Sequence, residues 1–154
     1  MNTLAIQTER REVIGRIETA IRTAPGSMEG DCFPLKHTFT DGMYIREISC
    51  PKGALVVTKT HKVCHPYFLL KGECSVLTEE GVKRIKAPYS GITPAGTKRV
   101  VFCHEDVVWT TCHATKETDL EKIEQEVIAN NFDEVDGFID TGIADFVKEI
   151  VEEK

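Results

Sequence analysis

The sequence has no long apolar run, no Cys-x-x-Cys pair and no excess of positive charge, and each absence excludes a class of protein. No window reaches the run of about 18 apolar residues that a membrane-spanning helix requires. Lysine and arginine number 19 against 25 aspartate and glutamate residues, which gives a formal net charge of −6. Such a surface is not built to bind nucleic acid. We therefore expect a small molecule or another protein as partner, with no nucleic acid and no membrane.

The N-terminus is charged where a secretory signal would be apolar. The first 16 residues, MNTLAIQTERREVIGR, carry three arginines, so we expect a cytoplasmic protein. The six cysteines lie inside apolar runs. Because free cysteine behaves as a small hydrophobic residue, we expect buried thiols rather than disulfides or a zinc-thiolate site. These cysteines are Cys32, Cys50, Cys64, Cys74, Cys103 and Cys112.

The apolar periodicity changes along the chain from helical to β and back to helical. Residues 9–24 repeat apolar side chains at helical spacing and predict an amphipathic helix. Residues 32–114 consist of short β-rich runs divided by turn signals, which is typical of an antiparallel barrel or sandwich. Residues 118–128 and 143–151 again show helical stripes, the first opened by Thr118 in capping-box spacing with a glutamate. We therefore predict a mainly β fold with one N-terminal and two C-terminal helices.

At 154 residues the chain is long enough to bury a core as one compact domain. We divide it into an N-terminal helix and linker (residues 1–30), a β-barrel (31–114) and a C-terminal helical segment (115–154). The apolar stripes of the helices need a surface to cover, either the outside of a sheet or a second subunit. We accordingly expect a homodimer or a higher homo-oligomer.

The stretch THKVCHPYFLLKG places His61 and His65 four positions apart. On a straight strand the two side chains share a face but lie about 13 Å apart, too far to bind one metal at about 2.1 Å per bond. Joint ligation therefore requires a bend or a bulge between them. The residues alone leave three roles open: metal ligation, hydrogen bonding to a ligand, and a structural role.

A second group of candidates lies in residues 97–113, which we predict to form a hairpin with its turn at 104–106. Cross-strand pairing about that turn sets Arg99 opposite Thr111. A third nitrogen ligand for a metal would then come from His113, or from His104 if the turn folds inward. One face of the hairpin carries Arg99, Cys103, Trp109, Thr111 and His113.

The orientation of Lys59 and Arg99 also stays open. On an outer face they are ordinary solvated charges, whereas a buried cation is costly unless an anion meets it. An inward Arg99 would form a bidentate clamp for phosphate or carboxylate beside the histidines. Such an anion pocket competes with the metal site, because a cation beside two others is disfavoured.

The runs PKGALVVTKTHKVCHPYFLLKGECSV and YSGITPAGTKRVVFCHEDVVW resemble the two motifs of the cupin superfamily, over about half of the chain. This resemblance implies a jelly-roll barrel that binds a divalent metal through two histidines and a glutamate of the first motif and one histidine of the second. With the runs aligned on Gly72, Lys59 and His61 stand at the two histidine positions and His65 at the glutamate position. In the second motif, Arg99 stands at the histidine position.

The resemblance predicts one divalent metal ion, either zinc, iron, manganese or nickel, and the residues add a small polar or anionic ligand inside the barrel. Shorter stretches such as HKVCH and HEDVVWTT are similar to small cupin-type proteins of tailed bacteriophages. That similarity implies a place in the host cytoplasm or in the virion. The alternative function is a non-catalytic oligomeric protein that uses the barrel as a scaffold. The candidate ligand-binding residues are Lys59, Arg99, Trp109 and Tyr67, and the candidate metal ligands are His61, His65, His113 and His104.

Overall fold

The computed structural model describes residues 3–23, 28–29, 33–58, 60–78, 80–127 and 135–138. Lys59 and the second predicted C-terminal helix, residues 143–151, lie outside the described residues. No helix in the described part of the chain is long and apolar enough to cross a membrane.

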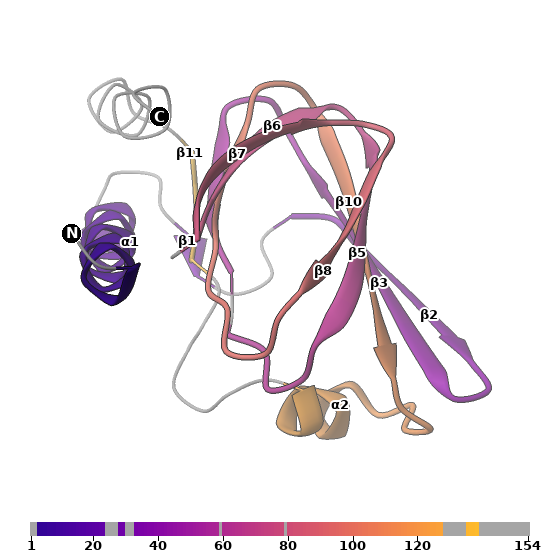
Figure 1. Cartoon of the computed structure of the whole chain (residues 1–154). Coiled ribbons are helices and arrows are strands. Elements are labelled where there is room, and N and C mark those ends of the chain that lie inside the picture. Colours follow the sequence, from indigo (N-terminus) through magenta and orange to yellow (C-terminus); the bar gives the residue numbers. More distant parts are fainter. Residues whose placement is uncertain are drawn as a thin grey trace.

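The described chain is mainly β and forms two antiparallel sheets that face each other (Figure 1). The first sheet has six strands, which lie side by side in the order β1 (Met28–Glu29), β11 (Val135–Phe138), β4 (Ala54–Val57), β9 (Val100–Cys103), β6 (Glu73–Thr78) and β7 (Gly81–Lys86). The second sheet has five strands, in the spatial order β2 (Leu35–Thr40), β3 (Met43–Cys50), β10 (Val107–Ala114), β5 (His65–Lys71) and β8 (Tyr89–Thr93).

The predicted jelly-roll architecture is confirmed. The chain crosses from one sheet to the other repeatedly, for example between β3 and β4 and between β5 and β6. Among the described strands the two sheets share no paired strands, so the barrel is not closed.

The core lies between the sheets because inward-pointing side chains alternate with outward-pointing ones along each strand. In β5, Tyr67 and Leu69 are buried and Phe68 and Leu70 are exposed. The inward side chains of both sheets form one apolar cluster. Each large aliphatic side chain buried there contributes roughly 1.5–3 kcal/mol to the free energy of unfolding.

Helix α1 (Thr3–Thr23) packs against the outer face of the six-stranded sheet, as Figure 1 shows. Ile14, Ile17 and Ile21 form its buried stripe, in contact with Leu55 of β4 and Phe102 of β9. The predicted N-terminal amphipathic helix is therefore confirmed, and a sheet face of this chain covers its stripe.

Helix α2 (Leu120–Val127) lies at one end of the barrel (Figure 1). Its N-terminus is capped by Asp119, whose Oδ1 accepts hydrogen bonds from two backbone N–H groups of the first turn at 3.0 and 3.3 Å. The predicted cap at Thr118 is thus displaced by one residue. Ile123 anchors the helix, since it is buried against Tyr44 of β3.

The hairpin expected within residues 97–113 is wrong. Residues 104–106 do not close a hairpin, because β9 pairs with β4 and β6 whereas β10 pairs with β3 and β5 in the opposite sheet. Arg99 and Thr111 are therefore not cross-strand partners. In addition, β11 is a strand inside the C-terminal segment that we predicted to be helical, and it pairs with β4.

Candidate metal centre and ligand cavity

Three histidines meet inside the barrel. The potential ligand atoms of His61, His65 and His113 all lie within 4.8 Å of one another. The ring centroids are 4.3 Å apart for His61 and His65, 4.6 Å for His65 and His113, and 5.4 Å for His61 and His113. Bonds of about 2.1 Å to one ion place neighbouring donors about 3–4 Å apart. The ligand atoms of this histidine triad are near that spacing, so the triad could hold a divalent metal.

A bend between His61 and His65 makes the triad possible. Residues 62–64 turn the chain, and β5 begins only at His65. The carbonyl oxygen of His61 accepts a hydrogen bond of 2.8 Å from the backbone N–H of Gly96, which fixes the segment before the bend. The bend that joint ligation requires is therefore present, and the separation of about 13 Å that a straight strand would impose does not apply.

Hydrogen bonds and ring contacts orient the other two imidazoles. Nδ1 of His65 lies 3.1 Å from the carbonyl oxygen of Val63, to which it donates, so Nε2 of that ring keeps its lone pair. Nε2 of His113 lies 2.9 Å from Oγ1 of Thr111, which leaves Nδ1 available when Nε2 carries the proton. The ring of Tyr44 also stacks on His113, with centroids 5.8 Å apart. Partners of this kind orient metal ligands in proteins.

All three imidazoles are held in the neutral form. Burial lowers the pKa of His61 to about 3, with further lowering by His65, His113, Arg46 and Arg99. Burial, with smaller effects of His65 and Arg46, lowers the pKa of His113 to about 4. Burial also lowers the pKa of His65, although its backbone hydrogen bond opposes the shift. At neutral pH each ring therefore offers a lone pair to a metal without releasing a proton.

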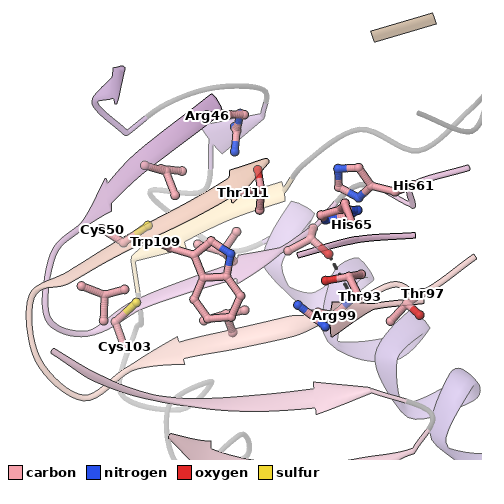
Figure 2. A pocket seen from close by; sticks show the side chains of 15 residues that line it. Arg46, Cys50, His61, His65, Thr93, Thr97, Arg99, Cys103, Trp109 and Thr111 are labelled. Atoms are coloured by element: carbon pink, nitrogen blue, oxygen red, sulfur yellow. Dashed lines mark hydrogen bonds between the residues drawn. The ribbon is translucent and has the colours of Figure 1, made fainter. Parts of the chain in front are cut away.

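His61 and His65 line a cavity of about 70 Å³ between the two sheets (Figure 2). One water needs about 10–15 Å³ of such space, so the cavity has room for several waters or one small molecule. Its remaining lining residues are Arg46, Ile48, Cys50, Val56, Thr58, Thr93, Thr97, Arg99, Val101, Cys103, Val107, Trp109 and Thr111.

Arg99 points into the cavity and is only 8% exposed, which excludes the solvated outer-face position. Its guanidinium carbon lies 4.5 Å from the ring centroid of Tyr67 and 5.9 Å from that of Trp109. Those two rings stack with centroids 4.6 Å apart and planes 7° from parallel. Burial lowers the pKa of Arg99. Three of the four candidate ligand-binding residues are thus brought together beside the cavity.

His104 is not brought to the triad. Its Nε2 lies 2.7 Å from Oγ of Ser75, and its ring meets Phe102 edge-on at 4.8 Å between centroids. Both contacts are with the six-stranded sheet, and His104 is absent from the cavity lining. The fourth candidate ligand-binding residue, Lys59, lies outside the described residues.

Thr93 and Arg46 are among the cavity residues that were not singled out as site residues from the sequence. Thr93, the last residue of β8, is 3% exposed, and its Oγ1 has no hydrogen-bond partner among the described residues. Arg46 lines the cavity from β3. Strand alternation could have indicated Thr93, because Thr93 pairs with His65 in neighbouring strands, and directly paired residues share a face.

The described cysteines are free thiols. Burial raises the pKa of Cys74 to about 12, and a hydrogen bond that the Cys103 thiol donates to Cys50, together with burial, raises the pKa of Cys103. Such thiols are unreactive at neutral pH. Cys64 is exposed, contrary to the expectation that the cysteines are buried.

No family model and no curated protein matches the chain. The solved structures that resemble it include a cupin-2 domain protein from Shewanella frigidimarina, at 8% identity and a TM-score of 0.46 over 53% of this chain and 80% of that one. An RmlC-like cupin family protein from Methanocaldococcus jannaschii matches at 14% identity and a TM-score of 0.46, over 56% of this chain and 84% of that one. An acetylacetone dioxygenase from Acinetobacter johnsonii matches at 20% identity and a TM-score of 0.46, over 58% of this chain and 62% of that one. With TM-scores below 0.5, none of these likenesses supports a conclusion about this chain.

Proposed function

We propose that the protein binds one divalent transition-metal ion through His61, His65 and His113, and that this centre binds or transforms a small oxygen-bearing molecule in the adjoining cavity. The observation that carries the proposal is the meeting of three neutral, inward-pointing imidazoles whose ligand atoms lie within 4.8 Å of one another. Imidazole suits zinc, iron and nickel. Three protein ligands also leave coordination positions open for a small molecule.

The other residues of the cavity supply the environment of this centre. Its described lining residues include no aspartate or glutamate, so no carboxylate neutralises an ion held by three neutral rings. A bound ion would act there as a Lewis acid that polarises an oxygen of the ligand or of a water. Thr111 holds the ring of His113, and the apolar wall around Trp109 limits access of bulk water.

A second candidate function is self-association, with the barrel as a scaffold. Phe68 and Leu70 of β5 and Ile92 of the neighbouring β8 are 37%, 55% and 60% exposed. Contiguous exposed apolar side chains are typical of protein interfaces. Light scattering tests this candidate: a dimer that Ile92→Lys converts to a monomer supports it, and a monomeric wild type overturns it. A virion role, as the bacteriophage resemblance implies, would require such an assembly.

Elemental analysis of protein purified without a chelator tests the metal site. The wild type should carry about one equivalent of a divalent metal per chain, and His61→Gln or His113→Gln should carry far less. His104→Gln is the matched control, since it removes a histidine outside the triad. Metal at background in the wild type, or unchanged metal in both triad variants, would overturn the proposal.

A further inference from the structure

We infer that the cavity takes a small monocarboxylic acid, with the carboxylate between Arg99 and the histidine triad and a short apolar body directed toward Cys50 and Val107. The contact of the carboxylate with a metal at the histidine triad rests on the proposed function. The other contact, with Arg99, depends only on this chain.

The first argument is the state of the Arg99 side chain. The residue is 8% exposed, and its Nε has no hydrogen-bond partner among the described residues. The stacked faces of Tyr67 and Trp109 offset part of the cost of burying the charge. Nε–H still has no partner among the described residues, and no described acidic side chain lines the cavity. An anion from outside the chain completes this arrangement.

A second unpaired donor lies at the same end of the cavity. Thr93 is 3% exposed, and its Oγ1 lacks a partner within the described residues. Figure 2 shows Thr93, Thr97 and Arg99 grouped near His61 and His65. A carboxylate has two oxygens with about four acceptor sites. It can therefore accept from the guanidinium and a hydroxyl while one oxygen faces the triad.

The rest of the cavity sets the shape of the ligand. Away from the polar group, the lining consists of aliphatic side chains, the Trp109 ring and two thiols, Cys50 and Cys103, and the pKa of Cys103 is raised. A neutral, apolar wall favours a hydrocarbon body and disfavours a second charge. The volume of about 70 Å³ corresponds to about five to seven non-hydrogen atoms at one water per 10–15 Å³. Butyrate has this size and polarity.

Charge balance favours an acid over a phosphate or a neutral ligand. A metal ion and Arg99 repel each other, and one anion between them removes this conflict. A neutral ligand would leave the guanidinium uncompensated. A phosphate carries a larger charge, which costs more to desolvate beside the apolar wall of this cavity.

The test is calorimetric titration of the purified protein with butyrate, its neutral analogue butyramide, and inorganic phosphate, with metal content measured on the same samples. Butyrate should bind at least about 10-fold more tightly than the other two compounds. Arg99→Met should weaken butyrate binding about 10–100-fold, since a hydrogen bond to a charged group is lost, and the isosteric Thr93→Val should weaken it less. Arg84→Met is the matched control, because Arg84 is a surface arginine paired with Glu73 at 2.8 Å.

Each contrary outcome identifies what fails. No butyrate binding, equal binding of butyramide, tighter binding of phosphate, or unchanged affinity in Arg99→Met overturns the inference. When the wild type carries metal but binds no butyrate, the inference fails and the metal site stands. Butyrate binding that depends on Arg99 in a protein without metal supports the carboxylate pocket and overturns the proposed metal site.

Discussion

His61 and His113 stack with their ring centroids 5.4 Å apart and their planes 9° from parallel. His61 precedes the bend before β5, and His113 lies near the end of β10. The two meet because β10 pairs with β5 on one side and with β3 on the other. The histidine triad is therefore a product of the tertiary structure, and a change at any of these strands moves its imidazole rings.

The first prediction concerns the pH dependence of stability in the metal-free protein. The pKa values of His61 and His113 are lowered from 6.5 to about 3 and about 4 in the folded state. Below pH 6.5 the unfolded chain binds protons that the folded chain does not. The free energy of unfolding should thus be highest above pH 6.5 and should fall as the pH drops toward 3. Below pH 3 these two histidines should cause no further decrease. Urea unfolding at a series of pH values measures it.

The control for this prediction is the double variant His61→Gln/His113→Gln, which removes the two groups. Its midpoint should decline less steeply between pH 6.5 and 4 than that of the wild type. Identical slopes would show that the two histidines do not stay neutral in the folded protein.

The second prediction compares two glycines in left-handed backbone conformations. Gly72, between β5 and β6, has φ +87°, and a Cβ there would clash with the carbonyl oxygen of Asp106. Gly42, between β2 and β3, has φ +82° and no heavy atom within 4 Å of such a Cβ. Gly42→Ala should cost about 1 kcal/mol of backbone strain. Gly72→Ala should cost roughly 1–3 kcal/mol more, because of the clash.

Urea denaturation of the two variants measures this difference. Both should retain the same secondary structure by circular dichroism, so that the comparison concerns the free energy of unfolding. Equal losses would mean that β5 and β6 do not approach the connection at Asp106 as closely as described.

The third prediction separates ligand binding from stability at Arg99. A buried cation that serves the fold has a partner, and its removal costs about 3–5 kcal/mol. The side chain of Arg99 has cation–π contacts and an Nε without a partner among the described residues. In ligand-free buffer Arg99→Met should therefore change the free energy of unfolding by less than about 1 kcal/mol in either direction. A loss of several kcal/mol in urea denaturation would assign Arg99 a structural role instead.

The features that could be predicted from the sequence are those with local causes. The turn at Gly72 follows from the residue type, because its positive φ favours glycine. The apolar spacing of Ile14, Ile17 and Ile21 predicted α1. Arg99, Trp109 and Thr111, which we placed on one face, all line the cavity, although the hairpin from which we derived that face does not exist.

The features that could not be predicted depend on distant strands. The connection at 104–106 looks like a hairpin turn, and sequential strands usually pair. Here β9 pairs with β4 and β6 and so lies in the sheet opposite β10. This pairing places His104, which follows β9, away from the triad. The bend at residues 62–64 has no glycine, and it is held from outside by the hydrogen bond from Gly96 to His61.

The most direct measurement of the central claim is a calorimetric titration of the metal-free protein with Zn²⁺. The wild type should bind one ion per chain, His113→Gln should bind at least about 10-fold more weakly, and His104→Gln should match the wild type. No uptake of zinc by the wild type, or equal affinity in His113→Gln, would contradict a metal centre formed by His61, His65 and His113.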